Sequence, residues 1–180
     1  RKSTGKGWLI RACSYFALII AAFMFLFGIN FNIYYLLLVR RFRSVLKSTE
    51  TWCYIAICLI SVSIITGNIY SIYGNLPDSV RASAFQVASL VTTTGFSTAD
   101  FNLWPGLSKG ILLILMFIGG CAGSTAGGLK VSRVVMMIKM IRREFMKMIH
   151  PRSVSAVRIE GKKVDDTTLN GVNVYFALYM

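Results

Sequence analysis

The sequence predicts an all-α integral membrane protein. Of its 180 residues, 55% are hydrophobic, and the formal net charge is +13. The basic residues cluster at the junctions between long apolar runs, and only Arg81 and Lys109 are basic between residues 51 and 129. Apolar runs flanked by positive charge are typical of membrane helices. The composition excludes an ordinary soluble domain and a disordered chain, and the charge distribution does not form a nucleic-acid-binding stripe.

Two apolar runs, at residues 12–39 and 52–73, predict spanning helices. Each is longer than the roughly 20 residues that a helix needs to cross the hydrocarbon core. Between them lies RRFRSVLK (residues 40–47), whose basic side chains are typical of a cytoplasmic loop. In residues 1–50 the sequence therefore predicts one transmembrane helix followed by a cytoplasmic connection.

A shorter segment at residues 79–91 is expected to enter the membrane without crossing it. At about 1.5 Å per residue it would be about 20 Å long, less than the thickness of the hydrocarbon core. The basic residues near 40–47 and 139–152 both indicate the cytoplasm, so the chain between them crosses an even number of times. The apolar run at residues 52–73 and the apolar run that begins at residue 107 supply these two crossings. Residues 51–150 are therefore predicted to form a helix, a re-entrant helix, a loop and a second helix.

The loop after the re-entrant helix contains TTTGF (residues 92–96), which we interpret as an ion-selectivity filter. The carbonyl end of a helix carries a partial negative charge, and successive backbone carbonyls can replace the hydration shell of a monovalent cation. Glycine permits the positive φ that turns neighbouring carbonyls onto one axis, and Phe96 is expected to pack behind them. The alternative is a threonine-rich turn with Ser97 and Asp100 as a cap. The candidate ion ligands are Thr92, Thr93, Thr94 and Gly95.

The run GGCAGSTAGGLK (residues 119–130) allows three interpretations. A phosphate-binding loop of the form G-x-x-x-x-G-K-[ST] is not matched, because Leu129 separates Gly128 from Lys130. Small residues at four-residue spacing suit close packing of a straight helix over residues 107–129. Glycine costs about 1 kcal/mol inside a helix, which favours instead a hinge with helix on both sides. The residue pattern leaves the packing helix and the hinge equally open.

Several of these motifs together closely resemble the membrane subunit of the Trk/Ktr/HKT superfamily of potassium transporters, and TrkH-type sequences are the most similar. The resemblance lies in SLVTTTGFSTADFNLWPG, ILLILMFIGGCAGSTAGGLKVSRV, IHPRSV and GINFNIYYLL. It implies a potassium-channel-like pore built from four covalently linked helix–pore helix–filter–helix repeats. It also tips the glycine-rich run toward a gate that lies beneath the filter.

The resemblance implies a division of the chain. Residues 1–50 would be the end of the preceding pore repeat, with its transmembrane helix at 12–39, and residues 151–180 a cytoplasmic linker and the start of the next. Residues 51–150 would be a complete repeat: outer helix 52–73, pore helix 79–91, filter 92–96 and inner helix 107–149, broken at 119–128. The expected gate residues are Gly119, Gly120, Gly123, Ser124, Thr125, Gly127, Gly128 and Lys130.

The resemblance further implies potassium transport across the cell (plasma) membrane by a multi-pass protein. Potassium is the only expected cofactor, with no organic one. The expected partners are a second copy in a homodimer, a cytosolic nucleotide-binding ring of the TrkA or KtrA type, and the lipid bilayer, but no nucleic acid. Whether transport is channel-like or an ion-coupled symport stays open.

The sequence offers no carboxylate pair or nucleophile–base set, so it predicts that the protein is not an enzyme. Two rival functions stand beside transport. One is a membrane scaffold whose glycines only pack helices, and the other is a membrane enzyme that binds phosphate in the glycine-rich run.

Overall fold

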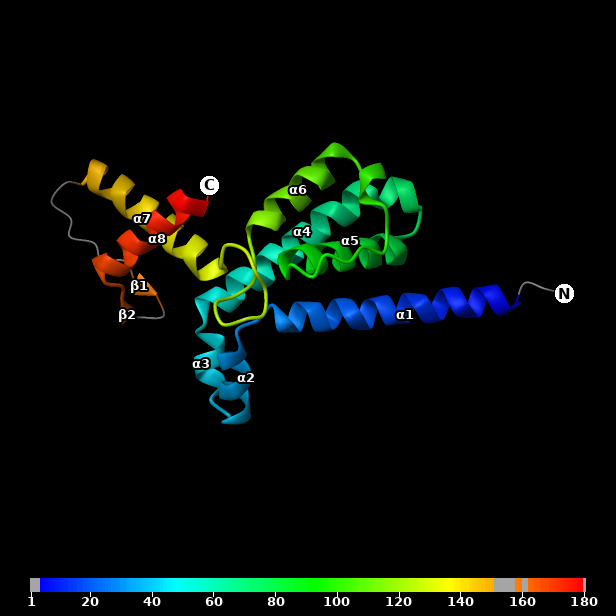
Figure 1. Ribbon diagram of the computed structural model, residues 1–180, viewed down its shortest axis with the longest axis horizontal. Helices are drawn as coiled ribbons and strands as arrows, with labels where there is room; N and C mark the ends of the chain where they lie inside the picture. The colour runs from blue at the N-terminus through cyan, green and yellow to red at the C-terminus, as the bar shows by residue number, and fades with distance from the viewer. Residues whose placement is uncertain (1–3, 151–157, 160–161, 180) are drawn as a thin grey trace.

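The structure is a computed structural model that describes residues 4–150, 158–159 and 162–179. It is mostly helical, and α1 runs alongside α5 of a bundle formed by α4, α5 and α6, with its N-terminal part extending beyond the bundle (Figure 1). Of the expected cytoplasmic linker and start of the next repeat at 151–180, residues 151–157, 160–161 and 180 lie outside the described residues. The elements are α1 (Thr4–Phe27), α2 (Phe31–Leu38), α3 (Phe42–Leu46), α4 (Thr49–Tyr73), α5 (Leu76–Val91), the 3-10 helix η1 (Phe101–Leu103), α6 (Gly106–Phe117), α7 (Val131–Ile149), β1 (Arg158–Ile159), β2 (Lys162–Lys163) and α8 (Asp166–Tyr179).

The first apolar run does not form the single helix that the sequence predicts over residues 12–39. It forms α1 and α2, which are bent by 88° at a short break. Asn30 lies at the break and caps α2, because its Oδ1 accepts a hydrogen bond from Asn32 N at 2.9 Å. The Gly28 carbonyl accepts from Cys121 N at 3.0 Å. The single-helix prediction is wrong because backbone groups at the break bond to a distant loop, which apolarity does not reveal.

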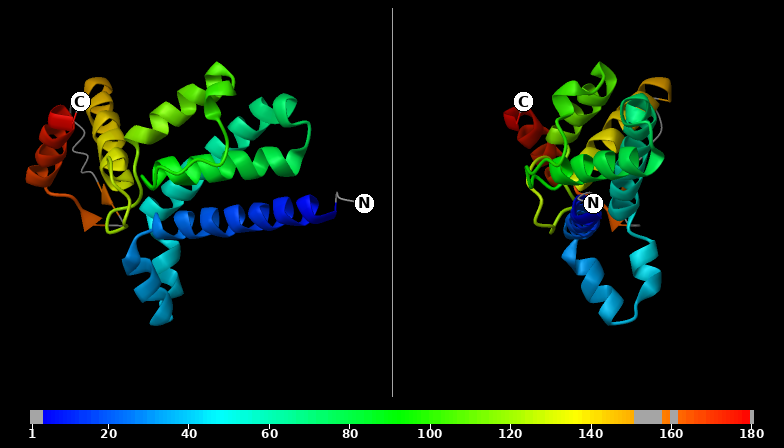
Figure 2. Two further views of the ribbon diagram at one scale, coloured as in Figure 1. Left: turned by 45° about the vertical axis from the view of Figure 1, so that its right-hand side comes forward. Right: turned by 90° about the vertical axis from the view of Figure 1, so that its right-hand side faces the viewer.

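Helix α4 is the centre of the hydrophobic core. It packs along α5, α6 contacts both, and α1 lies against α5 (Figure 2). Polar groups inside the bundle are paired: the hydroxyl oxygens of Thr66 and Ser83 are 2.6 Å apart, and Asn68 Nδ2 donates to Ser108 Oγ at 2.9 Å. These contacts fix the middle of α5 and the start of α6 relative to α4. Core residues include Tyr54, Cys58, Ile65, Ile69, Val87, Val91, Leu112 and Leu115.

The capacity to span a membrane is concentrated in a few of the described helices. By length and composition, α4 is the one described helix that could cross alone, and α1 with α2 qualifies only as a bent pair. Helix α6, with 12 residues, is apolar but shorter. Exposed apolar side chains such as Phe16, Phe23, Leu59 and Leu113 cover the outward faces of these helices. Such a surface is typical of contact with lipid or with further protein.

A two-stranded hairpin after α7 departs from the all-α prediction. β1 pairs antiparallel with β2, with Arg158 opposite Lys163. Neither strand has the alternating apolar pattern that marks a strand in a sequence, which is why the sequence did not predict it. Beyond the hairpin, α8 lies against α7, and the Arg133 guanidinium carbon is 3.8 Å from the centre of the Tyr175 ring.

Candidate functional site

The TTTGF segment (residues 92–96) begins where α5 ends. Thr92 N donates to the Ala88 carbonyl at 3.0 Å and so closes the helix. Two residues of the segment have a positive φ, Thr93 at 55° and Gly95 at 81°. Glycine adopts this conformation readily, but for a β-branched residue such as threonine it is an outlier that surrounding contacts must hold. The segment is therefore a specifically held turn of backbone.

Ser89 of α5 supplies the main contacts that hold this segment. Its carbonyl accepts from Thr94 N at 2.9 Å and from Gly95 N at 3.4 Å, and its Oγ donates to the Phe96 carbonyl at 2.5 Å. A trans peptide unit points its N–H and its C=O in opposite directions, and the described chain has no cis peptide bond. The carbonyls of Thr93 and Thr94 therefore point away from the Ser89 carbonyl of α5, and both residues are exposed.

Ser89 and Gln86 are site residues that the sequence analysis did not assign. Both are buried, and Gln86 Oε1 accepts from Ser97 Oγ at 3.1 Å. The signal that could have found them is their three-residue spacing, which places two polar side chains on one face of a short helix. They act from behind the segment rather than on its exposed side.

The expected packing of Phe96 behind the carbonyls is not observed. Phe96 does not pack behind the segment, because 70% of its surface is exposed. Its carbonyl, and not its ring, is the group that Ser89 holds. Asp100 does cap a following helix, since its Oδ1 accepts from Asn102 N at 3.0 Å at the start of η1. This capping bond joins residues that follow the segment, so the carbonyls of residues 92–95 take no part in it.

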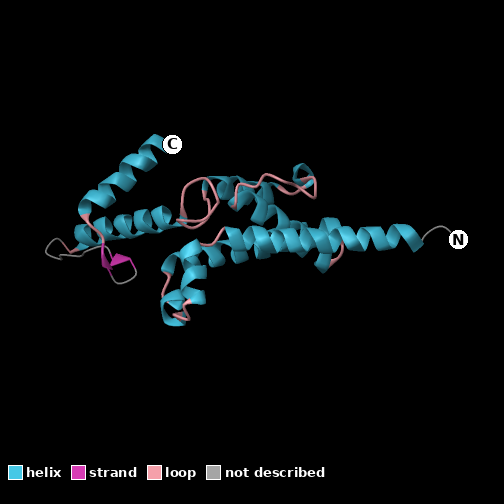
Figure 3. Ribbon diagram, turned by 60° about the horizontal axis from the view of Figure 1, so that its bottom comes forward, coloured by secondary structure: helices cyan, strands magenta, loops and turns pink. Residues whose placement is uncertain are grey.

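Residues 118–130, the glycine loop, form the ring-shaped connection between α6 and α7 (Figure 3). The two ends of the loop are joined, because Gly119 N donates to the Leu129 carbonyl at 2.9 Å. A side chain at Gly119 would collide with the Gly127 carbonyl, so the two ends of the loop approach this closely only because residue 119 is glycine. The straight packing helix over residues 107–129 is not formed.

The glycine loop contacts the two other non-helical parts of the site. Gly127 N donates to Thr93 Oγ1 at 2.9 Å, which joins the loop to the TTTGF segment. On the other side, Thr125 Oγ1 donates to the Phe27 carbonyl at 3.3 Å at the break between α1 and α2. The structure thus brings the candidate filter and the candidate gate into direct contact. The remaining candidate gate residues, Gly120, Gly123 and Gly128, lie in the same loop.

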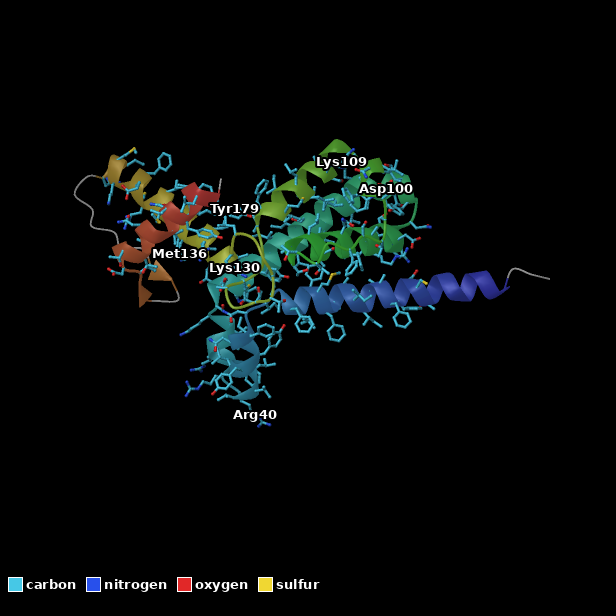
Figure 4. The ribbon with its side chains drawn as sticks, in the orientation of Figure 1. Arg40, Asp100, Lys109, Lys130, Met136 and Tyr179 are labelled. Atoms are coloured by element: carbon cyan, nitrogen blue, oxygen red, sulfur yellow. The ribbon has the colours of Figure 1, made fainter. Side chains whose placement is uncertain are left out.

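Lys130 and Ser124, which a phosphate-binding loop would use, are turned onto the loop itself. Lys130 Nζ donates to the Ala126 carbonyl, and Ser124 Oγ donates to the Cys121 carbonyl at 2.7 Å. Figure 4 shows Lys130 where the loop meets α7, at the opposite end of α6 from Lys109. These side chains stabilise the loop, and their polar groups already have partners within it.

The oxygens that this site offers to a ligand are neutral. In the part of the chain that the structure describes, no three or more His, Cys, Asp or Glu side chains gather where they could hold a metal ion. The oxygen atoms that the exposed residues 93–95 could offer to an ion belong to backbone carbonyls and threonine hydroxyls. Rings of such oxygens suit a weakly held monovalent cation rather than a tightly bound divalent one.

The match to a known family covers nearly all of the chain. A sequence model of TrkH, described as a cation transport protein, matches residues 11–180. The chain belongs to the TrkH family.

Curated TrkH relatives agree with this assignment. The chain is 34% identical over 164 residues to the Trk system potassium uptake protein TrkH of Salmonella typhimurium (strain LT2), which covers 89% of this chain and 34% of that protein. For TrkH of Escherichia coli (strain K12) the identity is 33% over 164 residues, with the same coverage. For TrkH of Halomonas elongata it is 44% over 101 residues, 56% of this chain and 21% of that protein. The chain spans about a third or less of the length of these TrkH relatives.

A solved TrkH structure has a similar fold. The crystal structure of the potassium transporter TrkH from Vibrio parahaemolyticus matches with a TM-score of 0.81 and 28% identity. The match covers 89% of this chain and 36% of that one. The relatives and this structure are named as transporters and not as enzymes.

Proposed function

We propose that this chain is part of a potassium uptake transporter in the plasma membrane, and that residues 92–95 lie on its ion path. One observation carries the proposal. The carbonyls of Thr93 and Thr94 turn away from the Ser89 carbonyl of α5, beside the hydrogen bond that joins Thr93 to the glycine loop. The choice of ion is supported by the relatives that are named for potassium uptake.

The ion ligands in this proposal are the backbone carbonyl oxygens of residues 92–95. A potassium ion gives up its water only where oxygens replace its hydration shell. The carboxyl end of α5 adds its partial negative charge at the same place. The hydroxyl oxygens of Thr92 and Thr94 are 2.7 Å apart, and this hydrogen bond restricts both side chains. Because these ligands are neutral, the ion is held weakly enough to leave again.

The helices fit one pore repeat. In this assignment α4 is the outer helix, α5 the pore helix, and α6 with α7 the broken inner helix, all within residues 51–150. Residues 1–50 end the preceding repeat, and residues 151–180 are a cytoplasmic linker and the start of the next. Four such repeats would surround one path, so this segment supplies one side of the filter.

The glycine loop is the gate beneath the filter. Its hydrogen bonds to Thr93 of the TTTGF segment and to Phe27 at the α1–α2 break support a position across the end of the proposed path. Because the loop is not helical, it can move by exchanging a few hydrogen bonds, without unwinding a helix. Displacing it from Thr93 would open the path.

The proposed partners act from the cytoplasm and from a second copy. We place a TrkA-like or KtrA-like nucleotide-binding ring beside α7 and a second copy of the protein in a homodimer. Helix α7 carries a dense group of basic residues, which is typical of the cytoplasmic end of a membrane protein. These residues are Lys139, Arg142, Arg143 and Lys147.

The substitution Gly95→Ser tests the filter. No atom lies within 4 Å of an added Cβ at Gly95, so the change acts on the positive φ of 81° and not on packing. A side chain disfavours that backbone conformation by about 1–2 kcal/mol, and the neighbouring carbonyls should shift. We expect a lower preference for K⁺ over Na⁺ in competitive uptake by the intact protein.

Gly110→Ser is the matched control, because Gly110 also has open space around it but lies within α6. It should leave the preference for K⁺ unchanged. Unchanged selectivity in Gly95→Ser as well would remove residues 92–95 from the ion path.

A further inference from the structure

Glu50, in the first turn of α4, lies against the glycine loop. Its Oε1 accepts one hydrogen bond from Ala122 N at 2.5 Å and another from Ser132 N at 3.2 Å. Ala122 belongs to the glycine loop and Ser132 to the first turn of α7. One carboxylate therefore bridges the loop and the helix that follows it. Glu50 is also the only acidic residue between positions 1 and 77 of the sequence.

The surroundings of Glu50 suit a negative charge. The first N–H groups of a helix lack partners within the helix and carry a partial positive charge. Lys130, at the N-cap of α7, makes no side-chain cap hydrogen bond, and Glu50 provides the missing acceptor from another helix. Glu50 also occupies the first turn of α4 itself. The carboxylate thus lies at the positive ends of two helices.

The other hydrogen bonds between the loop and its surroundings are between neutral groups. They include the bonds of Gly127 N to Thr93 Oγ1 and of Cys121 N to the Gly28 carbonyl. Hydrogen bonds to an ionised acceptor are roughly twice as strong as bonds between neutral groups. The hydrogen bond from Ala122 N to Glu50 is therefore the strongest single contact between the glycine loop and the core helix α4.

We infer that Glu50 is a positioning residue that holds the glycine loop in its closed position. This inference rests on the proposed role of the loop as a gate. Opening moves Ala122 away from α4 and breaks a charge-assisted hydrogen bond, so Glu50 biases the loop toward closure. The carboxylate contacts backbone N–H groups of the loop and of α7, and it sets the position of the gate and not the choice of ion.

Cys121 reports the position of the loop independently of transport. Its side chain is fully buried, so a closed loop protects the thiol from a membrane-permeant maleimide. In the intact protein, Cys13, Cys53 and Cys58 are replaced with alanine, which leaves Cys121 as the reporter among these residues. We expect Glu50→Ala to raise the labelling rate at Cys121 by about tenfold, since it removes a charged acceptor from two N–H groups.

Two further variants calibrate this result. Glu50→Gln keeps an acceptor oxygen at the same reach but loses the charge, so its labelling rate should fall between wild type and Glu50→Ala. Glu144→Gln removes a carboxylate from the exposed surface of α7, where hydrogen bonds from Lys147 and Arg143 lower the pKa of Glu144. It should leave labelling at Cys121 unchanged.

The outcomes separate this inference from the proposed function. Unchanged labelling in Glu50→Ala, or in Glu50→Gln if the alanine variant does not fold, overturns the role of Glu50. We expect ungated K⁺ flux to rise in the same variants, with the preference for K⁺ over Na⁺ unchanged. Faster labelling without higher flux would overturn the role of Glu50 in gating. Absence of K⁺ flux in the wild type would overturn the proposed function, while faster labelling would still show that Glu50 holds the loop.

Discussion

Thr93 has the least ordinary backbone in the candidate site. Its φ of 55° costs a β-branched residue about 1–3 kcal/mol. Its Oγ1 donates to the Thr92 carbonyl at 2.7 Å and accepts from Gly127 N at 2.9 Å, so the strained residue also ties the filter segment to the glycine loop. Threonine favours extended backbone, and the sequence therefore showed its chemistry but not its conformation.

Thr93→Val tests whether this hydroxyl holds the gate. Valine keeps the branched shape and the backbone preference of threonine but cannot accept a hydrogen bond from Gly127 N. Valine also loses the local bond to the Thr92 carbonyl, but only the bond from Gly127 N reaches the glycine loop. The loss of that neutral hydrogen bond is worth about 1 kcal/mol, and the loop should leave its closed position more often. We expect a severalfold increase in ungated K⁺ flux in proteoliposomes that contain the intact protein.

Thr93→Ser is the control for this experiment, because serine keeps the hydroxyl. Its ungated flux should stay near that of wild type. Equal flux from Thr93→Val and Thr93→Ser would show that the hydrogen bond to Gly127 has no part in gating.

At the scale of elements, the broken helix formed by α6, the glycine loop and α7 is the feature that couples structure to transport. The end of α6 and the start of α7 are held by Gly119 N bonding to the Leu129 carbonyl and by Val131 N bonding to the Gly120 carbonyl at 3.1 Å. The middle of the loop is held by longer-range contacts with Thr93 and Phe27. The loop can therefore move while its two ends stay joined.

Deletion of residues 123–125 tests this division of the loop. The deletion removes the contact of Thr125 with Phe27 but leaves the paired ends of the loop in place. We expect a folded protein with raised K⁺ flux in the absence of its regulator. Misfolding on gel filtration, with no change in the flux of any folded fraction, would instead favour a packing role for the glycines.

Apolar run lengths and charges located α4, α5 and α6, since these helices are specified by their own residues. The runs expected at 52–73 and 79–91 correspond to α4 at Thr49–Tyr73 and α5 at Leu76–Val91. The bend between α1 and α2 was missed because Gly28 and Phe31 bond to the distant glycine loop. Local sequence carries no record of such contacts, and the same reason hid Glu50, whose partners Ala122 and Ser132 are distant in the sequence.

At the scale of the whole molecule, the chain has an apolar exterior and a few polar side chains that bond to its loops. Exposed apolar side chains lie along α1, α4 and α6. Ser89 bonds to the TTTGF segment, Gln86 to Ser97 just after it, and Glu50 to the glycine loop. This arrangement fits a repeat that contacts lipid and further repeats on the outside and an ion path at its loops. Sequence motif and long-range contact coincide at the TTTGF segment and at the glycine loop, and Thr93 in the TTTGF segment also has a strained backbone.

The most direct test of an ion path at residues 92–95 is the position of a bound ion in the intact protein. Crystals or frozen particles prepared with Rb⁺ or Tl⁺ in place of K⁺ would show the ion by its strong scattering. We expect density coordinated by the carbonyl oxygens of Thr93 and Thr94, above the glycine loop. Ion density elsewhere in the protein, with none at these carbonyls, would contradict the proposed path.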